Sequence, residues 1–419
     1  MTSARPTSDV GPRISVSKKW LTRICSRWVW AWRALPERRS RIKVLHVITG
    51  LHNGGAEAAL FRLCMAEHTH SHAVVSLSDE GKYGPLLREA GVPLTCLSMP
   101  KGRLSLGGLA AFRRALSTHR PDIVQCWMYH ANLVGGVLSR LAGIRLVVWG
   151  MHNSGLDPLV APLATRMADR ACALISRVVP TQIVSCSQQA SRRHMSAGYS
   201  ASNWTIIPNG YDLAVFEPDE RARSRLRRTW SIDEGQFVIG SVARWHPDKD
   251  HRNLAAALAK LSARAEFPFK CILAGPGISP ENTDLAGLLD RYGVRDKVML
   301  LGPSDGVAAL MSAFDIHVLA SRREAFPNVV AEAMACGTPC VATDVGDIGM
   351  IVGNTGCVVP SRDPDALSRA ITNMALENRD SPSWETRQQA CRNRVASDFS
   401  VERMARAYSA LWERLSAKG

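Results

Sequence analysis

The feature that most constrains the fold of this chain is an alternation of short apolar runs and helical segments that occurs twice. The first series begins with a β-branched-rich run at 43–48, which a glycine-containing loop joins to a helical segment at 56–67. The second begins at 237–243 and continues through a polar loop at 244–253 into a helical segment at 254–264. Strands that alternate with helices predict parallel sheets covered by helices on both faces. The two series therefore predict two doubly wound, Rossmann-like α/β domains.

Further apolar runs and helical segments continue each series. In the first half we expect strands at 73–77, 123–126, 146–149 and 183–187, with helices at 107–118 and 131–142. In the second half we expect strands at 270–274, 298–301, 316–320 and 340–342, with helices near 305–313 and 328–335. Ligands of such sheets bind beyond the carboxyl ends of the strands, so we expect the site in the cleft between the two domains.

The chain is predicted to have four parts. With 419 residues, of which 46% are hydrophobic and 21% charged, it is long and apolar enough for two to three globular domains. We expect an N-terminal arm at 1–41, one α/β domain at 42–212, a second at 213–398, and a C-terminal helix at 399–419 that returns to the first domain.

The arm carries much of the excess charge. The net charge is +15, and residues 1–43 hold eleven Lys and Arg against two acidic residues. Within 18–35, Trp20, Trp28 and Trp32 recur at helical spacing beside arginines. A basic helix with a tryptophan face suits an anionic membrane surface, which we expect to be its partner. Packing on the protein itself and a disordered leader are the alternatives.

The cysteines and the hydropathy indicate a compartment. Eleven cysteines, without metal-ligand spacing, predict buried reduced thiols. No apolar run reaches the roughly 18–20 residues that a membrane-spanning helix needs. We expect a cytoplasmic protein, peripheral on the inner face of the cell membrane.

Two carboxylates mark the most informative stretch of the second half. Glu324 follows a predicted strand, and Glu332 lies eight residues later in the next helix, so both can face one ligand from different depths. The backbone amides of 326–330, at the start of that helix, are expected to bind an anion such as a diphosphate. Taken alone, the two glutamates are better explained as a loop residue and a surface charge on a helix.

With Arg244 and Lys249, this stretch resembles the donor site of family 4 glycosyltransferases, which have the GT-B fold. The signature of that family is Glu-x7-Glu followed by a helix of small residues and Gly-x-Pro, here Glu324, Glu332 and 337–339. The resemblance extends over most of 42–415 and includes the segments 54–57, 121–124 and 207–210. The N-terminal arm lies outside it.

The resemblance implies roles for individual residues. Arg244 and Lys249 would neutralise the donor diphosphate in place of a metal, Glu332 would bind the ribose hydroxyls, and Glu324 would contact the sugar. Ala325 stands where many relatives have glycine. The other donor-binding residues implied are Gly55, Phe326, Pro327, Asn328 and Val329.

The first half supplies residues to the other side of the cleft. Gly54 and Gly55 lack a Cβ and so allow close approach of a phosphate or an acceptor. The resemblance implies that His152 hydrogen-bonds the transferred sugar, with Asn153 and Asn209 lining the cleft. The remaining histidines include His46 in a strand and His251 in a loop, and both are expected to be structural or solvated.

The expected function is a retaining, metal-independent transfer of a sugar from a nucleotide sugar, a UDP- or GDP-sugar, to a lipid-linked saccharide in cell-surface polysaccharide or glycoconjugate synthesis. The first domain would bind the acceptor and the second the donor. No cofactor and no nucleic-acid partner are expected. The alternatives are a GT-B nucleotide-sugar epimerase, a basic nucleic-acid-binding protein and an inactive scaffold.

Overall fold

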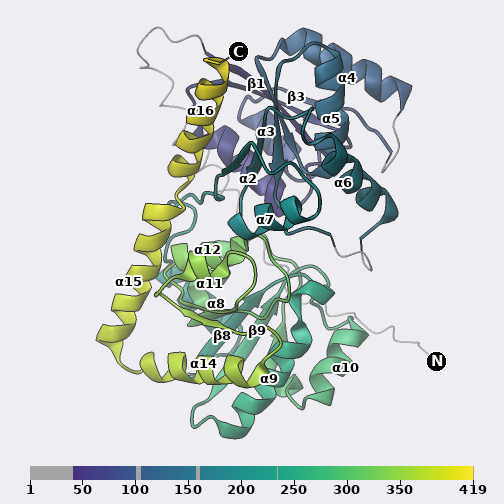
Figure 1. Cartoon of the computed structure of the whole chain (residues 1–419). Coiled ribbons are helices and arrows are strands. Elements are labelled where there is room, and N and C mark those ends of the chain that lie inside the picture. The colour runs from purple at the N-terminus through teal and green to yellow at the C-terminus, as the bar shows by residue number, and fades with distance from the viewer. Residues whose placement is uncertain (1–40, 101–104, 157–160, 234, 419) are drawn as a thin grey trace, which may run out of the picture. The chain divides into compact units, whose positions relative to one another are not determined.

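The computed structural model describes residues 41–100, 105–156, 161–233 and 235–418. Except for Arg41, the predicted arm and its amphipathic segment at 18–35 lie outside these residues. The described chain forms two parallel sheets with their helices (Figure 1). We call the seven-stranded sheet with its helices the N-lobe, and the six-stranded sheet with its helices the C-lobe.

The N-lobe sheet has the strand order β3-β2-β1-β4-β5-β6-β7. The order reverses direction between β1 and β4, which is where a doubly wound sheet opens a crevice for ligands. Its strands are β1 (Lys43–Ile48), β2 (Ser71–Ser76), β3 (Leu94–Cys96), β4 (Ile123–Trp127), β5 (Leu146–Met151), β6 (Gln182–Ser185) and β7 (Trp204–Ile206).

Helices cover both faces of this sheet. Side chains of β1 alternate between two cores, with Val44 and Ile48 in one and Leu45 and Val47 in the other. This alternation follows from the two-residue period of a strand. The helices are α2 (Gly55–Ala66), α3 (Tyr83–Glu89), α4 (Leu106–His119), α5 (Tyr129–Leu141), α6 (Leu163–Ile175) and α7 (Gln188–Ser196).

The C-lobe sheet has the order β10-β9-β8-β11-β12-β13, and its crevice opens between β8 and β11. The two parallel sheets confirm the two doubly wound domains that the two sequence series predict. The strands are β8 (Phe237–Val242), β9 (Phe269–Ala274), β10 (Val298–Leu300), β11 (Ile316–Leu319), β12 (Cys340–Thr343) and β13 (Cys357–Val359).

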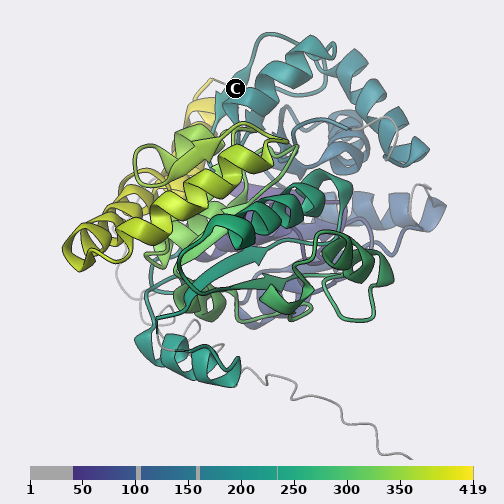
Figure 2. The same cartoon turned by 90° about the horizontal axis from the view of Figure 1, so that it is seen from below.

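The C-lobe helices also form two layers. Helices α9 and α14 lie side by side on one face of the sheet (Figures 1 and 2), and α8, α11, α12 and α13 contribute to the core on the other face. The elements are α8 (Glu220–Thr229), η2 (Pro247–Lys249), α9 (His251–Arg264), α10 (Thr283–Arg291), η3 (Arg295–Lys297), α11 (Val307–Ala313), α12 (Asn328–Ala335), α13 (Ile348–Val352) and α14 (Pro364–Glu377).

The last two helices belong to different lobes. Helix α15 (Ser381–Asp398) packs on α12 of the C-lobe, and α16 (Val401–Ser416) packs on α2 of the N-lobe (Figure 1). Trp412 and Tyr408 of α16 are buried in the N-lobe core. A Cβ on Gly210 would lie 2.6 Å from the Cα atom of Val401, so only glycine fits where the chain crosses between the lobes.

Three short strands lie outside the predicted set. Strands β3, β7 and β13 have three residues each, too few for a periodic pattern to stand out. The ten described cysteines are free thiols and eight of them are buried. In the described ranges, no helix has the length and apolar character that crossing a bilayer requires.

Candidate active site

The starts of two helices, one from each lobe, meet at the centre of the predicted site. A Cβ on Gly55, the first residue of α2, would lie 2.9 Å from the side-chain nitrogen of Asn328, the first residue of α12. Neither helix has a side-chain cap, since the N-cap residue of α2 is Gly54 and that of α12 is Pro327. Free amides and the helix dipole make each start electropositive. Their convergence creates a site that favours an anion.

The amides at the start of α12 differ in part from the prediction. Pro327 has no N–H, and the N–H of Val330 donates to the Pro327 carbonyl at 3.1 Å. The expectation that all amides of 326–330 are available is therefore wrong. In the described chain, the N–H groups of Phe326, Asn328 and Val329 have no hydrogen-bond acceptor, so three amides remain for a ligand.

Asn328 is held in place by two side chains of the segment that follows β7. Its Oδ1 accepts hydrogen bonds from Asn209 Nδ2 at 2.9 Å and from the Tyr211 hydroxyl at 2.6 Å. The side chain of Phe326 is buried against Phe399, with ring centroids 5.7 Å apart, so Phe326 can offer a ligand only its backbone. The predicted residues Asn209, Asn328 and Gly55 thus come together.

Lys249 and Glu324, predicted from distant motifs, form an ion pair. Lys249 Nζ lies 2.5 Å from Glu324 Oε1, and the Ser321 hydroxyl donates to the same oxygen at 2.7 Å. Lys249 is on the short helix η2, just after β8, and Glu324 follows β11, its neighbour in the sheet. The pairing places both charges at the crevice of the C-lobe.

Arg244 carries the uncommitted positive charge at this crevice. Its side chain is exposed and makes no hydrogen bond or ion pair with any described residue. Its carbonyl accepts a hydrogen bond from His251 Nε2 at 3.1 Å. His251 is only 6% exposed, at the first turn of α9. Of the two roles expected for His251, structural or solvated, the structure shows the structural one, because this buried histidine anchors the loop that presents Arg244.

Glu332 pairs with a residue that the sequence did not single out. Arg62 Nη1 of α2 lies 3.6 Å from Glu332 Oε1, and the two side chains are 12% and 13% exposed. Burial raises the pKa of Glu332, an effect that Arg62 opposes. The Arg62 guanidinium also lies 4.6 Å from the centre of the Tyr211 ring. The spacing offers a signal in retrospect, since Arg62 is two helical turns after Gly55 and Glu332 is one turn after Asn328.

His152 and Asn153 follow β5 at the N-lobe side of the site. The His152 ring stacks on Trp127 at 4.8 Å, and neither of its nitrogens has a hydrogen-bond partner among the described residues. Burial lowers the pKa of His152 to about 4, and the nearby Asn209 side chain opposes this shift without forming a hydrogen bond. Asn153 Oδ1 accepts from the Tyr129 hydroxyl at 2.8 Å, which leaves its amide nitrogen for a ligand.

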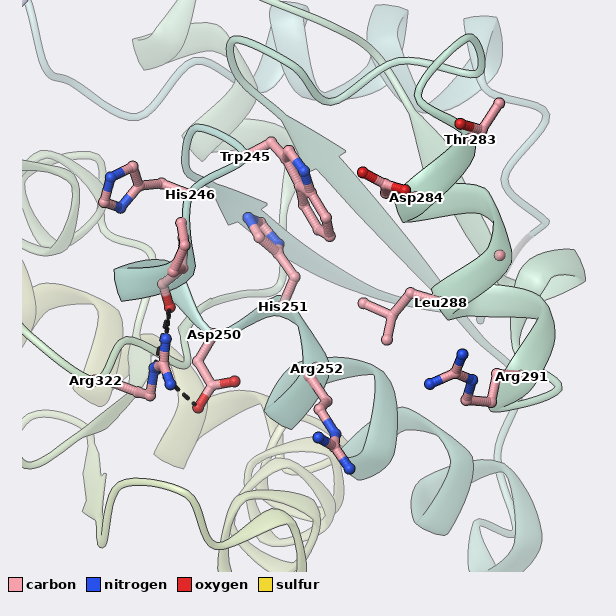
Figure 3. Close-up of a pocket in the computed structure, with 12 residues that line it drawn as sticks. Trp245, His246, Asp250, His251, Arg252, Thr283, Asp284, Leu288, Arg291 and Arg322 are labelled. Atoms are coloured by element: carbon pink, nitrogen blue, oxygen red, sulfur yellow. Dashed lines mark hydrogen bonds and ion pairs between the residues drawn. The ribbon is translucent and has the colours of Figure 1, made fainter. Parts of the chain in front are cut away.

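A cavity of about 510 Å³ lies in the C-lobe (Figure 3). It is bounded by the segment 245–252 and by α10, and Trp245 and Leu288 contribute apolar walls. Arg322 closes one side by donating to the Pro247 carbonyl. None of the predicted site residues lines this cavity, so the candidate site consists of the facing helix starts and their charges.

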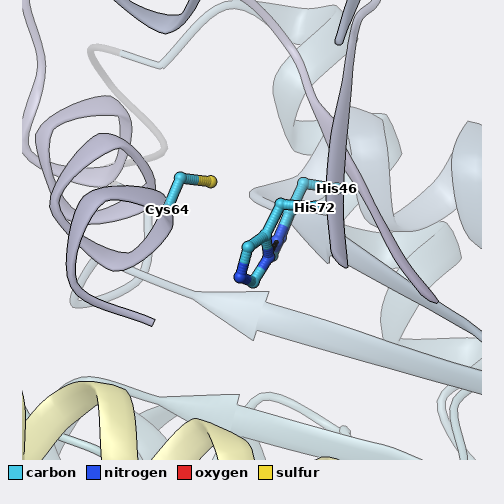
Figure 4. Close-up of side chains that lie close together, drawn as sticks. All are labelled: His46, Cys64 and His72. Atoms are coloured by element: carbon cyan, nitrogen blue, oxygen red, sulfur yellow. Dashed lines mark hydrogen bonds between the residues drawn. The ribbon is translucent and has the colours of Figure 1, made fainter. Parts of the chain in front are cut away.

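His46, Cys64 and His72 of the N-lobe lie close together (Figure 4), and their possible ligand atoms are within 4.8 Å of one another. Trp127 Nε1 donates to His46 Nδ1 at 3.2 Å, so the His46 proton is on Nε2, which contacts His72 Nδ1 at 3.0 Å. A metal on His46 Nε2 would move this proton to Nδ1, against the Trp127 N–H. Trp127, His46 and His72 therefore form a chain of hydrogen bonds, which a metal ion bound to His46 would disrupt.

Comparison with protein families covers both lobes. Residues 53–215 match the family model described as Glycosyltransferase Family 4, and residues 236–377 match Glycosyl transferases group 1. Among curated relatives, EpsF of Bacillus subtilis, by name a glycosyltransferase, is 25% identical over 73% of this chain and 80% of its own length. The UDP-Gal:alpha-D-GlcNAc-diphosphoundecaprenol alpha-1,3-galactosyltransferase of Escherichia coli is 22% identical over 86% of this chain and 94% of its own length.

Solved structures share the two-lobed architecture. HepE of Anabaena, crystallised in complex with UDP, superposes with a TM-score of 0.76 at 24% identity and covers 90% of this chain and 100% of its own. WaaG, a glycosyltransferase involved in lipopolysaccharide biosynthesis, superposes with a TM-score of 0.64 at 16% identity, over 87% of this chain and 98% of its own. These likenesses establish the GT-B fold.

The low pKa of His152 predicts a pH-dependent stability. The unfolded chain protonates this histidine near pH 6.5 but the folded protein only near pH 4, so stability is complete above pH 6.5 and falls as the pH decreases. Between pH 8 and pH 5, the wild type should lose about 2 kcal/mol more unfolding free energy than His152→Gln. Urea unfolding of both proteins at the two pH values measures the difference, and equal losses would contradict the assigned burial.

The Arg62–Glu332 pair should stabilise the contact between the lobes. Arg62→Ala leaves Glu332 buried without its partner, so we expect a loss of about 2–3 kcal/mol in unfolding free energy. Arg88→Ala, which breaks an exposed pair with Glu80, is the control and should cost less than about 1 kcal/mol. A double-mutant cycle with Glu332→Gln isolates the pair, and additive effects would show that the two residues do not interact.

Proposed function

Because this chain belongs to the family 4 glycosyltransferases of the GT-B fold, we propose that it moves a sugar from a nucleotide-sugar donor to a hydroxyl of a saccharide acceptor, with retention of the anomeric configuration. The observation that carries the proposal is the meeting of two uncapped helix starts at Gly55 and Asn328. Arg244 and Lys249 follow β8, and Lys249 pairs with Glu324, which lies four residues before α12 in the chain. Such a site matches a diphosphate.

The positive groups act on the leaving group. When the bond between the anomeric carbon and the diphosphate oxygen breaks, negative charge accumulates on the nucleoside diphosphate. The amides of Phe326, Asn328 and Val329 and the side chains of Arg244 and Lys249 stabilise this charge as it develops. Lys249 already lies against Glu324, so a bound diphosphate shares the lysine and leaves the carboxylate for the sugar.

Retention follows if the acceptor attacks from the side of the leaving group. The acceptor oxygen forms the new bond to the anomeric carbon, and its proton passes to an oxygen of the departing phosphate. His152 is neutral at physiological pH because of its burial, so it can exchange hydrogen bonds with the sugar without adding charge. This mechanism needs no protein nucleophile and no metal, since Arg244, Lys249 and the amides supply the positive charge.

The nucleotide is held on the C-lobe. Glu332 accepts hydrogen bonds from the ribose hydroxyls, and its raised pKa reflects a buried carboxyl that gains from such donors. A UDP- or GDP-sugar is the proposed donor. HepE, which shares this fold, was solved with UDP, and UDP is therefore the first nucleotide to test.

The acceptor is proposed to be a lipid-linked saccharide bound by the N-lobe, in the synthesis of a cell-surface polysaccharide or glycoconjugate. The relative from Escherichia coli is named for an acceptor joined to diphosphoundecaprenol, which supports this class of substrate. Such an acceptor requires the enzyme to work as a peripheral protein at the cytoplasmic membrane surface.

Removing either cation should slow the reaction while the fold survives. Lys249→Ala and Arg244→Ala each remove a group that stabilises the leaving diphosphate, so we expect kcat/KM to fall by roughly 10²–10³. The measurement is hydrolysis of the most reactive member of a panel of UDP- and GDP-sugars. Lys270→Ala and Arg264→Ala, at C-lobe positions outside the candidate site, are the matched controls; Lys270 is half-buried and Arg264 is exposed. Near-normal rates for both site variants would remove the assignment.

The donor should bind without a divalent metal. At about 100-fold excess over its Kd, a bound nucleotide adds about 2.7 kcal/mol to stability. We expect UDP or GDP to raise the Tm of the wild type equally with EDTA and with Mg²⁺, and to have a much smaller effect on Lys249→Ala. A rise that appears only when Mg²⁺ or Mn²⁺ is present would contradict the metal-independent site.

A further inference from the structure

Helix α6 presents an apolar stripe to the exterior of the N-lobe. Leu163, Met167 and Leu174 follow one another at spacings of four and seven residues, which places them on one face of the helix. Their exposed fractions are 67%, 61% and 82%, large values for apolar side chains. Val178, just beyond the end of the helix, is exposed too. Isolated exposed apolar residues are common on proteins, but several of them on one face of a helix indicate a binding surface.

A row of arginines runs beside the stripe. Arg166, Arg170 and Arg177 repeat the same spacings, three residues after each member of the apolar stripe. Their side chains make no hydrogen bond or ion pair within the ranges that the structure describes. The acidic residue of α6, Asp169, accepts a hydrogen bond from the Tyr199 hydroxyl at 2.7 Å. The outer face of α6 therefore combines apolar side chains with charges that are all positive.

The opposite face anchors α6 to the N-lobe. Ala168 and Cys172 are buried in the core that α6 shares with α5, so the stripe faces away from the sheet. In Figure 1, α6 lies at the rim of the N-lobe, beside α5. The apolar stripe is thus part of a firmly packed helix.

We propose that this face of α6 docks on an anionic lipid bilayer. The leucine and methionine side chains enter the boundary between headgroups and acyl chains, and the arginines bind lipid phosphates. A second copy of the chain is a poorer occupant, because a symmetric dimer places the same patch on both partners. Two arginine rows without acidic partners would then oppose each other, whereas an anionic membrane neutralises them.

The location of α6 connects this surface to the acceptor side of the site. The helix is the next element in the chain after β5, whose end carries His152 and Asn153. The docking of α6 would bring the acceptor side of the N-lobe near the lipid surface. This part of the inference rests on the proposed lipid-linked acceptor, whereas binding to a bilayer can be tested without any acceptor.

The test compares two pairs of substitutions in the full chain. Met167→Glu with Leu174→Glu alters the docking face, and Met350→Glu with Leu376→Glu makes the same changes at exposed positions of the C-lobe. Co-sedimentation with phosphatidylcholine vesicles containing phosphatidylglycerol measures partitioning. We expect the first pair to reduce partitioning at least about ten-fold and the second to leave it unchanged. UDP affinity should be the same in all the proteins, which verifies folding and tests the donor site separately.

Equal partitioning of the two double variants would overturn the proposal, even if the wild type binds vesicles through another segment. It would also be overturned if the α6 variant changed from dimer to monomer on light scattering while still binding vesicles, since α6 would then be a contact between copies. Loss of UDP binding by the wild type would contradict the proposed donor site but leave the vesicle result valid.

A second variant tests the arginines. Arg170→Gln with Arg177→Gln should weaken partitioning to the anionic vesicles about 30-fold and reduce its dependence on salt. Weak binding to pure phosphatidylcholine vesicles should remain, because the apolar stripe is intact. The same loss on both kinds of vesicle would contradict electrostatic docking.

Discussion

The arrangement of this enzyme depends on the close approach of two helix starts, where Gly55 of the N-lobe meets Asn328 of the C-lobe. Two electropositive helix ends repel each other, so their approach must be held by other contacts. Asn209 and Tyr211 hold Asn328. The carboxylate of Asp347 in the C-lobe accepts hydrogen bonds from the backbone N–H groups of Gln188 and Gln189 in α7, at 2.7 and 3.0 Å. A bound diphosphate would turn this repulsion into attraction.

The charges around this contact are largely balanced in pairs. Lys249 lies against Glu324, and Arg62 lies against Glu332, so each carboxylate that the resemblance assigns to the donor already has a cation beside it. Taking such charges out of water is costly unless they are paired. A donor must therefore exchange interactions with these pairs, whereas exposed Arg244 can meet a phosphate without breaking a contact.

The two substrates come from different environments in the proposed reaction. We propose that a water-soluble nucleotide sugar binds the C-lobe and that the acceptor is held at a lipid surface near the N-lobe. The basic, apolar face of α6 offers a way to keep one lobe at the membrane while the other remains in water. Binding both substrates across a contact between lobes then couples the two environments.

The sequence predicts the two-sheet architecture, because hydrophobic runs buried on both faces and separated by helices permit few other folds. It also determined the charged set Arg244, Lys249, Glu324 and Glu332, through the family motif. Packing between distant segments sets the short edge strands, the burial of His251, and the roles of Arg62 and Tyr211 as partners of site residues. Arg62 and Glu332 are far apart in the chain, and their helical spacing from Gly55 and Asn328 becomes informative only once the packing of the two lobes brings those two residues together.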